Sequence, residues 1–119
     1  MGKRALVCGD RNWTNREAII AWLSKLKDWG YDTVIEGEAK GADSIARDEA
    51  KEMGFEVIGF PAKWDLYGKA AGPIRNRQML VEGKPDLVLA FHSDIQHSKG
   101  TASMLRLARA SKVESILVQ

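Results

Sequence analysis

The sequence predicts a three-layer α/β/α sandwich around a five-stranded parallel sheet in the order 3-2-1-4-5. Short apolar runs alternate along the chain with segments whose apolar residues recur at helical spacing. The runs are apolar at nearly every position, which is typical of parallel strands that helices cover on both faces. Because connections between parallel strands are right-handed, this alternation favours a doubly wound order.

The first half of the chain supplies three strands and two helices. The apolar run 5–9 ends at a glycine and is the first strand. Thr14 or Asn15 can cap the helix that follows, and Gly30 can end it. The remaining elements are a strand over 33–35, a helix over 42–53 and a strand over 55–60.

The second half supplies two strands and two long helices. The segment 63–72 is expected to be irregular or a short helix, and to form a wall or lid. Pro73 suits the first turn of a helix. The remaining elements are a helix over 73–82, a strand over 85–91, a polar loop over 92–99, a helix that begins at Gly100 and Thr101, and a strand over 115–118.

Length and charge indicate one domain, residues 1–119, whose main partner is not nucleic acid. A chain of 119 residues with 45% hydrophobic content can build one continuous core. The net charge of +2 is too small for long-range attraction to nucleic acid. Residues 1–60 carry a net charge of −2 and residues 61–119 carry +4, so an anion site should draw on the second half.

The chain has one cysteine, Cys8, which excludes an internal disulfide and any cysteine-based metal cluster. No apolar stretch approaches the ~20 residues of a membrane span, and no signal segment precedes a cleavage site. We expect a cytoplasmic protein with no membrane association, no metal and no cofactor.

Four loops should converge where the first and fourth strands diverge at the carboxyl edge of the sheet. They cover residues 9–13, 37–43, 72–77 and 99–103. Glycine lets a backbone approach a ligand closely, and amides at a helix start point at an anion. The first two loops therefore predict a phosphate cradle, although the same glycines also suit ordinary tight turns between a strand and a helix.

The third loop places Arg75 and Arg77 on either side of Asn76 at a helix start. Guanidinium groups bind phosphate oxygens in a bidentate manner, which predicts a ligand contact. The alternative is that an arginine only pairs with Asp10 or Asp65, because surface ion pairs are common and weak.

In the fourth loop, amides and hydroxyls at Gly100 and Thr101 can hold a phosphate or a ribose. Ordinary helix capping by Ser98 or Thr101 explains the same residues. Aromatic side chains at Trp13, Trp64 and Tyr67 can stack on a base.

Two further features have a structural interpretation that we prefer. His92, Asp94 and His97 could ligate a metal or support acid/base chemistry, but a polar, mobile loop over the site is favoured, since structural zinc usually takes four ligands and no cysteine completes the set. Trp22 and Trp29, at helical spacing, are expected in the core or at an oligomer interface.

The loops also carry a resemblance to a known family. The segments 9–13 (Gly-Asp-Arg-Asn-Trp), 37–43 (Gly-Glu-Ala-Lys-Gly-Ala-Asp), 60–64 (Phe-Pro-Ala-Lys-Trp), 72–79 and Gly100-Thr101 resemble the YspA-type branch of the SLOG superfamily. The likeness covers nearly the whole chain. It implies a Rossmann-like fold that recognises nucleotides, nucleotide-derived signals or, in some branches, single-stranded DNA. Related domains include the Lonely Guy phosphoribohydrolases and DprA, and members of this branch occur in bacteriophages.

The chain departs from the family pattern at three positions. Asp10 replaces a serine, so this carboxylate is expected to face a ribose hydroxyl, a base amine or Arg75 rather than a phosphate. Glu38 replaces a glycine, so backbone contact with a ligand is not implied there. Met104 stands where Lonely Guy enzymes carry a catalytic Glu, and a thioether cannot act as an acid or base.

These observations favour binding of a nucleotide or nucleotide-derived small molecule, for sensing, sequestration or processing. The alternatives are a nucleotide hydrolase that cleaves an N-glycosidic or phosphoester bond, and single-stranded nucleic-acid binding, which the small net charge disfavours.

Whether the chain is an enzyme stays open, and candidate catalytic residues are Asp10, Glu36, Glu38 and Arg77. A homo-oligomer is expected, as related domains often assemble. The expected ligand-binding residues are Gly9, Asp10, Arg11, Trp13, Gly37, Lys40, Gly41, Ala42, Asp43, Trp64, Arg75, Asn76, Arg77, Gly100 and Thr101.

Overall fold

The five strands form one parallel sheet in the order β3-β2-β1-β4-β5, which confirms the predicted fold and strand order. This is seen in a computed structural model that describes residues 2–119. In the central strand, Leu6 pairs with Ile35 on one side and with Val88 on the other. The strands are β1 (Lys3–Gly9), β2 (Tyr31–Glu36), β3 (Glu56–Gly59), β4 (Leu87–Phe91) and β5 (Glu114–Val118).

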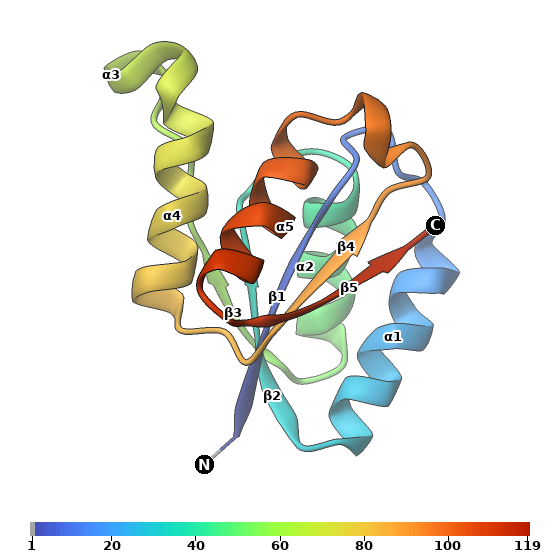
Figure 1. The fold of residues 1–119 in the computed structure, drawn as a ribbon. Coiled ribbons are helices and arrows are strands. Elements are labelled where there is room, and N and C mark those ends of the chain that lie inside the picture. The colour runs from blue at the N-terminus through green and yellow to red at the C-terminus, as the bar shows by residue number, and fades with distance from the viewer. Residues whose placement is uncertain (1) are drawn as a thin grey trace.

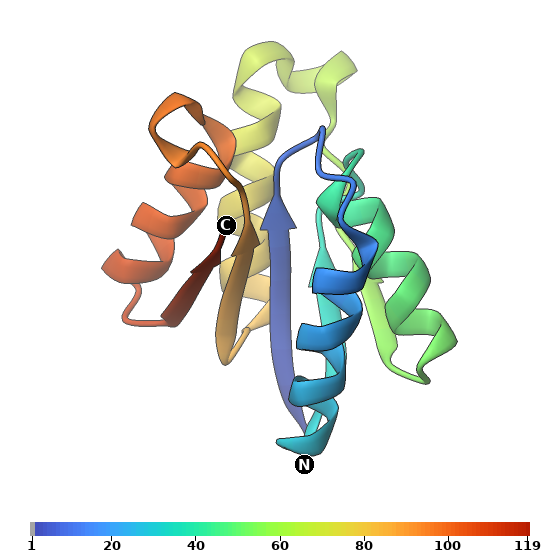
Figure 2. The same cartoon turned by 90° about the vertical axis from the view of Figure 1, so that its right-hand side faces the viewer.

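Helices cover both faces of the sheet (Figure 1). One face packs against α1 (Arg16–Asp28) and α2 (Ala42–Glu52), and the other against α4 (Ala71–Gly83) and α5 (Gly100–Ala110). Figure 2 shows the three layers from the side. Within residues 2–119, the helices are all too short or too polar to cross a membrane.

The central strand β1 contributes to both halves of the core because its side chains alternate between the two faces. Ala5 and Val7 pack in the cluster under α1 and α2, while Leu6 and Cys8 pack in the cluster under α4 and α5. All four are nearly or fully buried. This explains why residues 5–8 of the strand are apolar at every position rather than at every second one.

The expected caps and turns of α1 are present. The Asn15 side chain accepts a hydrogen bond from the Ala18 amide at 3.1 Å, which confirms Asn15 as the cap. Gly30 follows the helix with a φ of +90°, a backbone conformation that favours glycine.

The region between β3 and β4 consists of α3 (Trp64–Tyr67), the 3-10 turn η1 (Gly68–Ala70) and α4. Its α3 end projects beyond the carboxyl edge of the sheet, and α4 runs back from there along the sheet (Figures 1 and 2). The helix α4 begins at Ala71, two residues before the predicted start. Pro73 still lies in its first turn, where a missing N–H costs no helical hydrogen bond.

Candidate functional site

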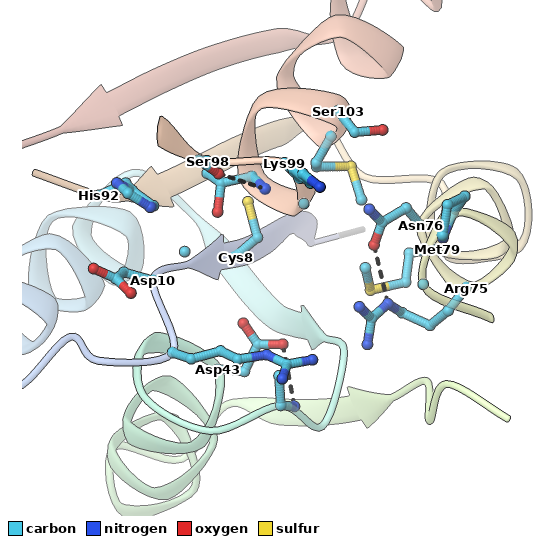
Figure 3. A pocket seen from close by; sticks show the side chains of 18 of the residues that line it. Cys8, Asp10, Asp43, Arg75, Asn76, Met79, His92, Ser98, Lys99 and Ser103 are labelled. Carbon is cyan, nitrogen blue, oxygen red and sulfur yellow. Dashed lines mark hydrogen bonds between the residues drawn. The ribbon is translucent and has the colours of Figure 1, made fainter. Parts of the chain in front are cut away.

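A cavity of about 580 Å³ opens at the carboxyl edge of the sheet, beyond β1 and β4 and between the first turns of α4 and α5 (Figure 3). In that view Asp10 and His92 lie on one side, and Arg75, Asn76 and Met79 of α4 on the other. The predicted ligand-binding residues that line it are Gly9, Asp10, Arg11, Asp43, Trp64, Arg75, Asn76, Gly100 and Thr101.

The other predicted residues lie outside this lining. Arg77 lines a second cavity on the outer face of α4, and Trp13 packs on Phe91 with ring centroids 5.5 Å apart. The remaining residues outside the lining are Gly37, Lys40, Gly41 and Ala42 and, among the catalytic candidates, Glu36 and Glu38.

Gly41 allows two loops of the backbone to approach each other. Its φ is +71°, and a Cβ atom at this position would overlap the carbonyl oxygens of Asp10 and Arg11. The Ala42 amide, at the start of α2, donates to the Asp10 carbonyl oxygen at 3.1 Å. The glycine is therefore needed for packing of the β1–α1 loop on the β2–α2 loop.

Asp43 holds the β2–α2 loop from inside. This side chain is 5% exposed, and its Oδ2 atom accepts hydrogen bonds from the amides of Gly37 at 2.9 Å and Ala39 at 3.4 Å. Burial raises the pKa of the Asp43 carboxyl, an effect that Arg75 and the two amides oppose. Loop amides that could have formed a phosphate cradle are thus bound to the protein's own carboxylate.

Arg75 reaches from α4 to the same loop. Its Nη1 group donates to the Gly37 carbonyl oxygen, and its Nε donates to Oδ1 of Asn76 at 3.0 Å. Burial lowers the pKa of the guanidinium, and Asp43 opposes this shift. Since a guanidinium has five N–H groups, the remaining ones can still bind a ligand in the cavity. Neither of the two alternatives suggested by the sequence, an ion pair with Asp10 or with Asp65, is seen among residues 2–119.

The cavity carries an excess of positive charge. Four cationic side chains line it, against the carboxylates of Asp10 and Asp43. Arg11 also lies over the Trp64 ring, 5.9 Å from its centroid, so the two side chains connect the β1–α1 loop to α3. The four cationic residues are Arg11, Lys69, Arg75 and Lys99.

The start of α5 forms one wall. Ser98 Oγ accepts hydrogen bonds from the amides of Thr101 at 3.1 Å and Ala102 at 3.3 Å, which confirms capping by Ser98. Its hydroxyl hydrogen stays available as a donor. A Cβ atom built on Gly100 meets nothing within 4 Å, so the backbone is open to an approaching group there.

The floor of the cavity is apolar and contains three sulfur atoms, those of Cys8, Met79 and Met104. Met104 is 1% exposed and lies at the position where the resemblance places a catalytic Glu. Burial raises the pKa of the Cys8 thiol, which keeps it protonated and unreactive. The floor can therefore contact a flat, weakly polar group and offers no acid or base.

Glu36 and Glu38 form a pair of carboxylates beside Gly59 on the neighbouring strand. Glu36 is 1% exposed, and its Oε1 atom accepts a hydrogen bond from the Glu38 amide at 2.7 Å. Burial raises the Glu36 pKa from 4.5 to about 7. Glu38 has a φ of +55°, which explains why a glycine is typical of the family at this position.

The histidine loop does not converge on one point. His92 lines the cavity, and its Nδ1 atom accepts a hydrogen bond from the Asp94 amide at 2.9 Å. The Asp94 carboxylate pairs instead with Nδ1 of His97 at 2.8 Å, where both side chains are exposed. Across residues 2–119, no group of three or more His, Cys, Asp or Glu side chains is arranged to hold a metal ion.

The lining also contains residues absent from the predicted ligand-binding set, among them Lys69, Met79 and Lys99. Met79 could have been found, because it follows Asn76 by three residues and so lies on the same face of α4. Lys99 stands directly before the predicted helix start. Lys69 carries no signal of its own, since the short elements around it do not fix its direction from the sequence.

The fold and the position of the cavity define a Rossmann-like α/β domain with its cavity at the switch point between β1 and β4. The chain belongs to the YspA, cpYpsA-related SLOG family, whose model matches residues 3–67. It is 34% identical over 121 residues to the Gene 61 protein of Mycobacterium phage D29, covering 96% of this chain and 94% of that protein. No solved structure matches the chain significantly.

Proposed function

We propose that the chain binds a nucleotide or nucleotide-derived small molecule in the cavity at the sheet edge. The observation that carries this proposal is the pairing of a cationic rim with an apolar floor in one cavity. Phosphates would lie between Arg11, Lys99 and the first turn of α5, where the helix dipole favours an anion. The base would lie against Met79 and Met104. A volume of about 580 Å³ is within the usual range for small-molecule sites.

We propose binding rather than turnover as the function. Asp10 and Asp43 are the acidic side chains in the lining, and both hold loop backbone: Oδ1 of Asp10 accepts from the Asn12 amide at 2.9 Å, and Oδ2 of Asp43 accepts from the Gly37 and Ala39 amides. Met104 stands where the related Lonely Guy enzymes carry a catalytic Glu. Chromatography of each nucleotide after incubation with the chain at high concentration tests this: an intact nucleotide supports binding, and a released base or phosphate contradicts it.

Isothermal titration with AMP, GMP, CMP, UMP and their diphosphates tests binding directly. Gly100→Ala is the sharpest variant, because the new methyl group meets no protein atom but stands where a phosphate would approach the backbone. We expect at least tenfold weaker binding with an unchanged or higher Tm, since alanine stabilises a helix relative to glycine.

Arg106→Ala is the matched control, because it removes a charge from an exposed position of the same helix and lies outside both cavities. The proposal fails if no nucleotide binds, or if Gly100→Ala binds as tightly as the unmodified chain.

A further inference from the structure

A second cavity, also of about 580 Å³, lies over the outer face of α4. Lys63, before α3, lines it, and so does Leu107 of α5. Three of its lining residues, Pro73, Arg75 and Ser103, also line the first cavity. The two cavities therefore adjoin at the first turn of α4.

The second cavity combines exposed apolar side chains with cationic ones. Ile74 and Val81 are seven residues apart and therefore lie on one face of α4. Their side chains are 42% and 65% exposed. Tyr67 of α3, 45% exposed, lies beside them. The charged lining residues are Lys63, Arg75 and Arg77 against Glu82.

This composition fits an anionic ligand with an aromatic part better than a protein surface. Arginine and tyrosine are common in protein interfaces, but lysine is depleted there; here Lys63 joins the two arginines around the apolar side chains, and Arg75 is shared with the cationic first cavity. An exposed tyrosine ring can stack on a base, and aliphatic side chains can cover the sugar. The excess of cations continues from the first cavity into the second through Arg75.

We infer that the two cavities form one site for a ligand in which two nucleosides are joined through phosphate. This inference rests on the proposed function of the first cavity. The joining phosphate lies beside Arg75 and Ser103, and the second nucleoside lies between Tyr67, Ile74 and Arg77. The same chemistry occurs in a small dinucleoside 5′,5′-diphosphate and in the 3′,5′-linked backbone of a nucleic acid.

Titrations with matched probes test the inference. Each of AMP and GMP is compared with its symmetric dinucleoside 5′,5′-diphosphate, with its 3′,5′-linked dinucleotide and with a 12-residue homopolymer. We expect the unmodified chain to bind one type of two-nucleoside probe at least tenfold more tightly than the mononucleotide, as one added charge-assisted contact would provide. A further gain for the homopolymer, lost at high salt, would assign the source to nucleic acid; no further gain would assign it to a small dinucleotide.

Arg77→Ala and Tyr67→Ala test the second cavity, and both positions are exposed, so the fold tolerates the changes. The measured quantity is the affinity for the two-nucleoside probe divided by the affinity for the mononucleotide. This ratio should fall from about tenfold towards one in either variant and stay at about tenfold in Arg106→Ala. The ratio is defined only where the mononucleotide binds. If no probe binds at all, that result contradicts the proposed function rather than this inference.

A ratio near one in the unmodified chain overturns the inference alone. So does a ratio that both variants leave unchanged. The other possible occupant of this face is a second copy of the chain, and light scattering of the unmodified chain and of Arg77→Ala tests it. A mass that falls to the monomer in the variant would assign this face to a second copy and would also overturn the inference.

Discussion

Replacing Glu36 with glutamine should make the protein more stable above neutral pH. The Glu36 carboxyl is 1% exposed, and burial raises its pKa from 4.5 to about 7. The nearby charges of Asp43 and Glu38 raise the pKa further, while the Glu38 amide and Arg47 oppose the shift. A neutral glutamine keeps an oxygen that can accept the Glu38 amide but carries no buried charge.

The size and sign of the effect follow from linkage. Between pH 4.5 and about 7 the folded state binds more protons at Glu36 than the unfolded state, so stability falls as pH rises through this window. A shift of this size corresponds to a loss of at most about 3 kcal/mol, complete above pH 7. Glu36→Gln should therefore match the unmodified chain near pH 4.5 and exceed it by up to about 3 kcal/mol at pH 8.

Urea unfolding at half-unit steps from pH 4.5 to 8.5 measures this difference. Glu52→Gln, at an exposed position near the end of α2, is the control and should run parallel to the unmodified chain. The reasoning is refuted if the stability of Glu36→Gln runs parallel to that of the unmodified chain across the whole range, or lies below it at pH 8.

Further predictions concern other positions. Gly41→Ala should lower the free energy of unfolding by at least about 2 kcal/mol, because its Cβ atom would overlap the Asp10 carbonyl; an unchanged urea midpoint would contradict this. Glu38→Gly should raise the Tm, because its φ of +55° costs a non-glycine residue about 1 kcal/mol or more; a lower Tm would show that its side chain matters more. Cys8 should react with a thiol reagent at pH 8 only after unfolding, and fast modification of the native chain would refute its burial. If the expected homo-oligomer forms through α1, Trp29→Ser, at a side chain 53% exposed, should lower the mass seen by light scattering; an unchanged oligomer mass excludes this face.

The fold could be predicted from the sequence because local and global signals agree. The continuous apolar run of β1 requires helices on both faces, and Asn15 and Gly30 mark the ends of α1 at the expected places. The sequence does not decide between irregular and helical structure for the short elements between β3 and α4, because four residues carry too little periodicity.

The site was predictable as a location but not residue by residue. Arg75 and Arg77 were expected to act together, yet residues two apart on a helix point in different directions: Arg75 lines both cavities, whereas Arg77 lines the second alone. Arg75 is in the shared lining because its long side chain crosses to the Gly37 carbonyl. The use of loop amides by Asp43 could not be foreseen either, since a carboxylate in the first turn of a helix equally suits the helix dipole.

Because a side chain at Gly41 would overlap the neighbouring loop, the two loops beside the cavity are restricted in length and position. The β1–α1 and β2–α2 loops touch backbone to backbone, so neither can be lengthened or moved without displacing the other. Arg11 in the first loop and Asp43 directly after the second both line the cavity, and they are therefore fixed relative to each other. New ligand specificity should arise more easily at the rim formed by α3 and α4, and a graft of one loop from a relative should succeed only when its partner is exchanged with it.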